Sequence, residues 1–237
     1  MQTIINSIDR TTSSALLADQ LRRDIILQKY TKGYLLNELS LSESMNASRS
    51  SIRTALIELE REGLVCTLSN GRKMVEEFNG KTINDVYQVR AVLESKAADL
   101  ILRKDVIDCT KMMKCIHEFE LLLVEKNIEK IVQERARNDA IFHRAIMEQS
   151  GNRYLYQCWL SQEPIYITLR SLQAQIIQPE AQYSEYILKH KKIMDLFLNR
   201  DASIITYLNE HISGATSMLI KNIKILSESE HFAEREA

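Results

Sequence analysis

Four side chains in the second half of the chain have the chemistry of metal ligands and interrupt the apolar faces of predicted helices. Asp139 and His143 are four residues apart in a helix predicted over residues 128–149, so they share one face. His190 and His211 each lie within the apolar face of a later predicted helix. The bend predicted at residues 199–201 would place both histidines roughly 15 Å along their helix axes from the turn. The four side chains are therefore predicted to meet inside a helical bundle.

A carboxylate and three imidazoles buried together are unfavourable unless a partner satisfies them. A divalent metal does so directly, and nitrogen and oxygen ligands suit zinc, manganese or nickel. Open coordination positions on such a metal would face a cavity in which a small carboxylate could bind. The alternative is a set of core residues that hydrogen bond to one another or to hydroxyl groups. The pattern alone leaves both interpretations open.

A second set of polar side chains lies on a helix predicted over residues 48–62. Ser48 begins this helix as an N-cap, and Arg49 and Arg53 lie one turn apart beside Ser50. A guanidinium can donate two hydrogen bonds to a guanine edge or bind a phosphate, and short hydroxyl side chains let a helix approach the major groove closely. The alternative is an ordinary packing unit whose arginines are solvated. The predicted buried face consists of Ile52, Ala55, Leu56 and Leu59.

The elements around this helix have the order of a winged helix-turn-helix. Helices are predicted over residues 14–27 and 36–44, and residues 45–47 form the turn that leads to Ser48. Gly63 is predicted to end the helix that begins at Ser48. Two strands at residues 64–69 and 72–75 flank Asn70 and Gly71, which favour a two-residue type I′ turn. Asn70, Gly71, Arg72 and Lys73 would lie at the tip, where a wing contacts the DNA backbone or the minor groove.

After an interruption at residues 76–84, the rest of the chain is predicted to be helical. We therefore expect a mostly α protein: residues 1–78 form a winged helix-turn-helix domain with a small β-hairpin wing, and residues 79–237 form an all-α helical bundle for effector binding and dimerisation. Pro164 is expected to kink the fourth helix of the bundle, and the tail from residue 227 is expected to fray. The predicted helices span residues 83–103, 106–125, 128–149, 153–175, 179–199 and 201–226.

The composition fits this organisation. The chain has 237 residues, 45% of them hydrophobic, with only 6 glycines and 2 prolines, which is typical of two helical cores with short connections. No apolar run is long enough to cross a membrane, and the first residues lack the pattern of an export signal. The 4 cysteines lack the spacing of a zinc site or a secreted disulfide framework. We therefore expect a cytoplasmic protein with reduced thiols and no membrane association.

Residues 33–75 resemble the DNA-binding domain of the GntR family of bacterial transcription regulators. The resemblance implies that Arg49 and Arg53 are the arginines of the recognition helix and that Asn70 and Gly71 form the tip of the wing. Leu39 stands where some members have another DNA-contacting arginine, and Lys32 precedes Gly33 where a proline is usual. The matching residues are Leu35, Glu38, Leu41, residues 47–49, Ile52, Arg53, Ala55, Leu56, Leu59, Glu60 and residues 62–65.

The second half resembles the FCD domain, which is the helical effector-binding module of the FadR branch of that family. This resemblance implies that Asp139, His143, His190 and His211 bind a divalent metal. It also implies that Arg90, with Glu94 beside it, binds the carboxylate of an effector above the metal. The alternative for Arg90 and Glu94 is an ion pair within one helix. The matching segments are residues 86–90, Leu93, Glu94, residues 138–143, residues 150–152, His190, and residues 200–201 through His211.

We therefore expect a ligand-responsive transcription regulator, a repressor rather than an enzyme, that responds to a small organic acid. A homodimer is expected because one reading unit contacts only half of a pseudo-palindromic operator in double-stranded DNA. One alternative is a metal-dependent hydrolase that uses the same four ligands and a metal-bound water, although no general base is evident beside them. Another is a constitutive DNA-binding or adaptor protein without an effector.

Overall fold

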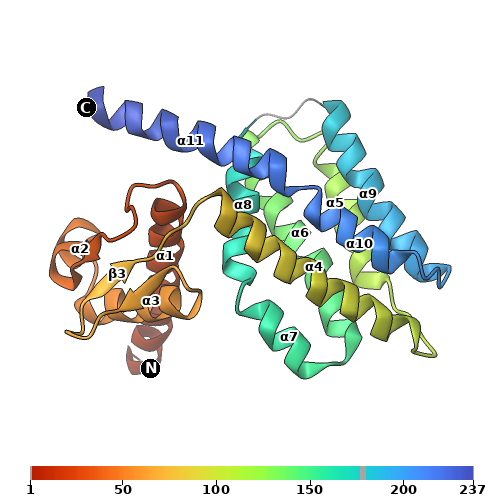
Figure 1. Ribbon diagram of the computed structural model, residues 1–237, viewed down its shortest axis with the longest axis horizontal. Coiled ribbons are helices and arrows are strands. Elements are labelled where there is room, and N and C mark those ends of the chain that lie inside the picture. Colours follow the sequence, from red (N-terminus) through yellow and green to blue (C-terminus); the bar gives the residue numbers. More distant parts are fainter. Residues whose placement is uncertain (1, 177–179, 237) are drawn as a thin grey trace. The chain divides into compact units, whose positions relative to one another are not determined.

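The computed structural model describes residues 2–176 and 180–236, which divide into two compact units (Figure 1). The N-terminal unit runs to Thr82 and also includes the chain from Ile223 onward. The helical unit spans Ile83–Asn222. Helices predominate in both units, and the described strands form a small antiparallel sheet, so the predicted mostly α fold is confirmed.

The N-terminal unit is a helix-turn-helix followed by a small sheet. α1 (Gln2–Ile26) and α2 (Glu38–Ser44) both pack against α3 (Arg49–Arg61). The sheet has the order β1-β3-β2, in which β3 (Lys73–Val75) pairs with both β1 (Leu35–Leu36) and β2 (Val65–Thr67). The predicted winged helix-turn-helix is therefore confirmed, although α1 begins well before the predicted residue 14.

Local signals account for the limits of α3. The Ser48 hydroxyl accepts a hydrogen bond from the backbone N–H of Ser51, so Ser48 is the N-cap. Gly63 follows the helix with φ of +79°, a conformation that glycine adopts without strain. The predicted buried face is confirmed, since all four of its residues have 0% exposure: Ile52, Ala55, Leu56 and Leu59.

The turn between β2 and β3 differs from the predicted two-residue type I′ turn. The N–H of Leu68 donates to the carbonyl of Arg72, so the loop contains residues 69–71. A type I′ turn requires positive φ at both central residues, but Gly71 alone in this loop has positive φ, at +80°. Gly71 also donates to the carbonyl of Leu68 over 2.8 Å. This is the three-residue hairpin in which a turn ends in a left-handed glycine.

The helical unit is built from helices that pack along α6 and α9. α6 (Ile128–Ser150) packs against α5 (Thr110–Leu121) and α8 (Glu163–Gln175). α9 (Glu180–Leu198) packs against α5 and α10 (Ile204–Ser213). The unit also contains α7 (Arg153–Leu160) and most of α4 (Gly80–Leu102). α11 (Thr216–Glu236) begins in this unit and continues into the N-terminal unit from Ile223. Among the described residues, none of these helices has the length and apolarity that crossing a membrane requires.

Two of the predicted helices are each divided in the structure. The helix predicted over residues 153–175 is α7 and α8, and Pro164 lies in the first turn of α8 instead of producing a kink. Proline is tolerated there because a first-turn residue needs no N–H donor. The helix predicted over residues 201–226 breaks between α10 and α11. α11 then continues to Glu236, through the tail expected to fray, and the predicted start at residue 179 lies outside the described residues.

Candidate metal centre, effector cavity and DNA-binding surface

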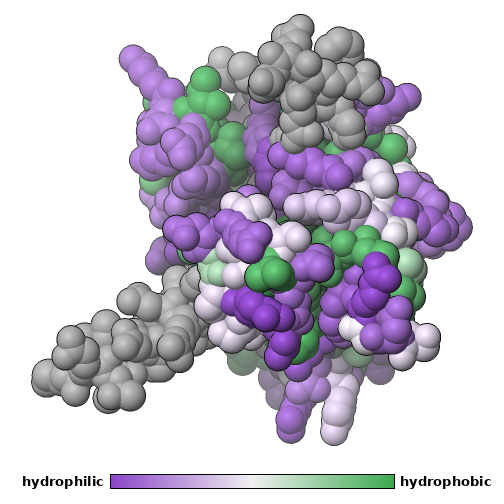
Figure 2. Space-filling model, turned by 90° about the vertical axis from the view of Figure 1, so that its left-hand side faces the viewer, coloured by the Kyte–Doolittle hydropathy of each residue, from purple (hydrophilic) through white to green (hydrophobic). Residues whose placement is uncertain are grey.

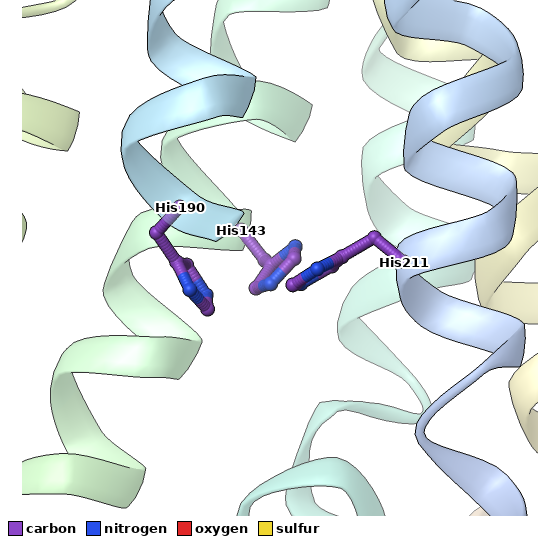
Figure 3. A group of neighbouring side chains, drawn as sticks. All are labelled: His143, His190 and His211. Atoms are coloured by element: carbon purple, nitrogen blue, oxygen red, sulfur yellow. The ribbon is translucent and has the colours of Figure 1, made fainter. Parts of the chain in front are cut away.

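Three imidazoles from three helices of the helical unit face one another (Figure 3). They belong to His143 on α6, His190 on α9 and His211 on α10. One ring nitrogen from each residue lies within 4.8 Å of the others. The ring centroids of His190 and His211 are 4.9 Å apart, so the connection between α9 and α10 does bring these two residues together.

Hydrogen bonds determine which ring nitrogens face the centre of this cluster. His143 Nδ1 lies 2.6 Å from Glu94 Oε2, and His190 Nδ1 lies 2.9 Å from the carbonyl oxygen of Tyr186. Because both partners are acceptors, each Nδ1 donates a hydrogen bond, and in the neutral form of either ring the lone pair is on Nε2. His190 Nε2 and His211 Nδ1 are buried without a hydrogen-bond partner. Such unsatisfied nitrogens are what a metal ion would ligate, so these residues fit a divalent metal.

Asp139 lies beside the three imidazoles, as the sequence predicts. Its Oδ1 atom is 3.4 Å from His190 Nε2 and 4.0 Å from His143 Nε2. The same oxygen accepts hydrogen bonds from the Tyr186 hydroxyl and from Arg170, over 2.5 and 3.1 Å. These bonds hold the carboxylate toward the cluster, so Asp139 is placed as a candidate fourth ligand.

The pKa shifts of His190, His211 and Asp139 suit metal binding. Burial lowers the pKa of His190, and burial with the neighbouring imidazoles holds the pKa of His211 well below its usual value. Burial alone would raise the pKa of Asp139, but Arg170 and His190 outweigh it and hold this pKa well below the usual value. These shifts favour neutral imidazoles at His190 and His211 and an ionised carboxylate at Asp139, which are the forms that ligate a metal cation.

A cavity of about 470 Å³ opens beside the cluster, within the size range of small-molecule sites. Asp139, His143 and His211 contribute to its wall. Three arginines also line it, namely Arg90, Arg135 and Arg170. Guanidinium groups form strong, often bidentate, hydrogen bonds with carboxylates, so the lining favours an anionic ligand.

Arg90 forms the predicted ion pair and also lines the cavity. Its Nε atom donates to Glu94 Oε1 over 2.7 Å, which is the expected pair within one helix. The guanidinium also lies 5.0 Å from the ring centroid of Tyr166 and 3.9 Å from Asp139 Oδ2. Arg90 therefore reaches the cavity while it remains paired with Glu94.

Glu94 is not placed to contact an effector, contrary to expectation. It is completely buried and does not belong to the cavity wall. Its Oε1 atom accepts from Arg90 and from Trp159 Nε1, and its Oε2 atom faces His143. Burial raises the pKa of Glu94, but His143 and Arg90 outweigh this effect and lower the pKa to about 2. Glu94 thus lies behind His143, where an ionised carboxylate orients the imidazole.

Three residues of the site are absent from the sequence prediction: Arg135, Arg170 and Tyr186. Arg170 follows Leu169 and lies one turn after Tyr166 on the buried side of α8. Arg170 could have been identified by the same criterion as His143, since both are ionisable residues at the apolar face of a helix. Tyr186 precedes His190 by one turn, so its position could also have been inferred from helical spacing.

The predicted DNA-contacting residues lie on α3 and on the hairpin tip of the N-terminal unit. Arg49, Arg53 and Ser50 are exposed, and so are the tip residues Asn70, Gly71 and Arg72. The hydroxyl of Ser48 caps α3 and lies 2.8 Å from that of Ser50. Among the coloured side chains of the face shown in Figure 2, hydrophilic ones predominate, with hydrophobic areas between them.

The side chain of Lys73, predicted to lie at the wing tip, is held by two hydrogen bonds. Its Nζ atom donates to Glu60 Oε2 and to the hydroxyl of Thr67, each over 2.6 Å. Only 15% of its side chain is exposed. Lys73 therefore joins the wing to the last turn of α3.

The sequence matches two family models. Residues 14–75 match bacterial regulatory proteins of the gntR family, and residues 85–214 match the FCD domain. The chain therefore belongs to the GntR family of bacterial transcription regulators and carries an FCD domain, an architecture consistent with the FadR branch.

Curated relatives are also transcription regulators. The gluconate operon transcriptional repressor of Bacillus licheniformis is 23% identical over 201 residues, which cover 84% of this chain and 81% of that protein. The uncharacterized HTH-type regulator YdhC of Bacillus subtilis is 28% identical over 146 residues, 58% of this chain, and the match spans only 60% of that regulator's length. These relatives and the matched domains identify a DNA-binding transcription regulator and not an enzyme.

Solved structures share the fold at low sequence identity. The regulator Lar of Listeria monocytogenes has a TM-score of 0.61 and 15% identity, with 90% of this chain and 97% of that chain covered. A GntR transcriptional regulator from Rhodococcus sp. RHA1 has a TM-score of 0.59 and 16% identity, with 89% and 98% covered. At these identities the similarity extends to the fold alone.

Proposed function

We propose that this protein is a repressor that binds a pseudo-palindromic operator as a homodimer and responds to a small organic acid at a metal centre. Residues 1–78 would bind DNA, and residues 79–237 would bind the effector and form the dimer. The observation that carries the proposal is the group of three converging imidazoles, two of which have unsatisfied nitrogens, beside a cavity lined by arginines.

In this proposal Asp139, His143, His190 and His211 hold a divalent metal, for which zinc, manganese and nickel all suit the nitrogen and oxygen donors. When bound, the metal would supply a Lewis acid that attracts a carboxylate. Arg90 would then donate hydrogen bonds to the acid group from the cavity wall. Because one relative is named as the repressor of a gluconate operon, gluconate is the first acid to test.

The DNA-binding part of the proposal assigns two kinds of contact. Arg49 and Arg53 would enter the major groove, with the hydroxyls of Ser48 and Ser50 permitting close approach of α3. Asn70, Gly71 and Arg72 at the hairpin tip would contact the DNA backbone or the minor groove. Two copies of the chain are required because one such unit reads a half-site. A protein that acts on the chromosome of a bacterium would work in the cytoplasm.

Effector binding would change DNA affinity by shifting an equilibrium. An acid that prefers one packing of the helical unit would populate that packing, and the chain at residues 76–84 would carry the change to the reading helices. Such a response requires that the acid have different affinities for the two packings.

The proposal is tested with an operator selected by the protein from a random duplex pool. Operator affinity is then measured by fluorescence anisotropy on metal-loaded protein, with and without gluconate and other small organic acids. We expect operator binding to be lost in Arg49→Ala/Arg53→Ala, and an active acid to weaken binding by the wild type but not by His190→Ala. The exposed Arg103→Ala, at the end of α4, is the control variant. A protein whose operator affinity responds to none of the acids would be a constitutive DNA-binding protein.

A further inference from the structure

We propose that Glu38 is a positioning residue that determines which base Arg53 reads. One operator position would then be specified by the Glu38–Arg53 pair and not by Arg53 alone. This inference rests on the proposed function in one respect, since it requires that Arg53 enter the major groove.

The pair joins the two helices of the helix-turn-helix. Glu38 Oε1 accepts from Arg53 Nε over 3.0 Å, and Glu38 Oε2 accepts from Arg53 Nη2 over 2.8 Å. Glu38 is the first residue of α2, whose N-cap Asn37 accepts from the backbone N–H groups of Leu39 and Ser40. The carboxylate therefore projects from a capped helix end, and its bidentate contact holds the plane of the guanidinium.

This contact leaves the reading edge of Arg53 available. A guanidinium has five N–H groups, and Glu38 uses the one on Nε and one of the two on Nη2. The edge formed by Nη1 and the second N–H of Nη2 remains for the O6 and N7 atoms of guanine. The Arg53 side chain is 61% exposed, whereas that of Glu38 is 24% exposed. The Arg53 guanidinium is therefore exposed to solvent, while Glu38, which holds it, is half-buried.

Glu38 also places a negative charge among the cations of this surface. Its pKa is lowered, first by the hydrogen bonds from Arg53 and also by the charges of Arg49 and Lys73, so the carboxylate is ionised at neutral pH. A carboxylate at this place opposes the phosphates of any duplex and reduces affinity that is independent of sequence. Because the same group orients Arg53 toward a base, its net effect is to increase discrimination between operator and other DNA.

A competing role would be inhibition, in which Glu38 simply competes with DNA for Arg53. The two roles predict different outcomes when the carboxylate is removed. Inhibition predicts that Glu38→Gln binds operator and unrelated DNA more tightly by the same factor. Positioning predicts tighter binding to unrelated DNA, weaker binding to the operator and a loss of preference at one base pair.

The experiment repeats the selection from a random duplex pool with five full-length proteins. Wild type defines the operator, and Arg53→Ala identifies the base pair in each half-site that depends on Arg53. We expect Glu38→Gln to lose its base preference at that same position, with a fall on the order of tenfold in the ratio of operator to unrelated-DNA affinity. Glu60→Gln is the matched control, because it removes the same charge from α3 beside Lys73 without touching Arg53.

The selected sequences also show whether Glu38→Gln is correctly folded. Positions that do not depend on Arg53 should keep their preference in Glu38→Gln, which a misfolded variant could not show, and Glu38→Asp should recover part of the lost preference. If Glu38→Gln keeps the preference at the Arg53 position, the positioning role is refuted while the proposed function stands. If wild type selects no recurring sequence, the proposed function itself fails.

Discussion

Glu94 and His143 are 49 residues apart in the sequence, yet Glu94 Oε2 lies 2.6 Å from His143 Nδ1. Through its other oxygen, Glu94 also accepts hydrogen bonds from Arg90 and Trp159. One buried carboxylate therefore connects the cavity arginine, the imidazole cluster and an indole. A substitution of Glu94 should therefore affect Arg90, the imidazole cluster and Trp159.

Replacing this carboxylate should weaken metal binding at the proposed centre. We expect Glu94→Gln to reduce metal affinity by roughly 10- to 100-fold, because an orienting carboxylate fixes the tautomer of a ligating histidine and increases its basicity. Competition with a chromogenic chelator measures the dissociation constant. Glu163→Gln is the control, since Glu163 is a buried acid of the same unit that binds Arg144 and no histidine. An unchanged dissociation constant in Glu94→Gln would contradict the orienting role.

The indole of Trp159 should report on the same network. Trp159 is the single tryptophan of the chain, and it is buried. Its Nε1–H group donates a hydrogen bond to Glu94 Oε1 over 2.9 Å. We expect zinc to alter the tryptophan emission of metal-free protein, because the charge at His143 changes the field at Glu94. The change should disappear in His211→Ala. A zinc titration that leaves the emission spectrum constant while zinc binds would show that Trp159 is not coupled to the centre.

Metal removal should destabilise the fold. A ligand that binds only the folded state stabilises it by about 2.7 kcal/mol at a concentration 100-fold above its dissociation constant. Differential scanning calorimetry should therefore show a lower melting temperature after chelation, with recovery on adding zinc. In His190→Ala both effects should be much smaller, because a ligand with an unsatisfied nitrogen is gone. Equal chelator sensitivity in the two proteins would place any metal elsewhere.

A buried ion pair in the N-terminal unit should matter for stability. Arg22 binds both carboxylate oxygens of Glu62 over 2.6 and 2.7 Å, and the two side chains are 2% and 5% exposed. Burial raises the pKa of Glu62 even though Arg22 opposes it. Arg22→Met should therefore lower the free energy of unfolding by about 3–5 kcal/mol, because it leaves a buried carboxylate unpaired.

Urea denaturation measures this loss of stability, and two variants make it specific. Arg22→Met/Glu62→Met should recover much of the stability, since a pair replaced by apolar groups leaves no buried charge. Arg103→Met removes an exposed partner of Asp99 and should change the free energy of unfolding far less than Arg22→Met does, because solvent screens an exposed ion pair. Equal losses in Arg22→Met and Arg103→Met would show that the buried pair contributes no more than a surface pair.

Features that depend on neighbouring residues could be predicted from the amino-acid order. The N-cap at Ser48, the buried face of α3 and the stop at Gly63 follow from hydrogen bonds and side-chain spacing within one helix. The four candidate ligands were recognisable for a similar reason, because each places an ionisable group on an apolar helix face.

Features that depend on contacts between distant segments required the folded arrangement. Helical spacing placed Glu94 beside Arg90 but could not show that it lies behind His143, since that depends on how α4 packs near α6. The bidentate contact between Glu38 and Arg53 likewise spans two helices. Sequence periodicity predicts the direction in which a side chain points from its own helix axis. The group that this side chain contacts depends on packing between helices, which no local pattern encodes.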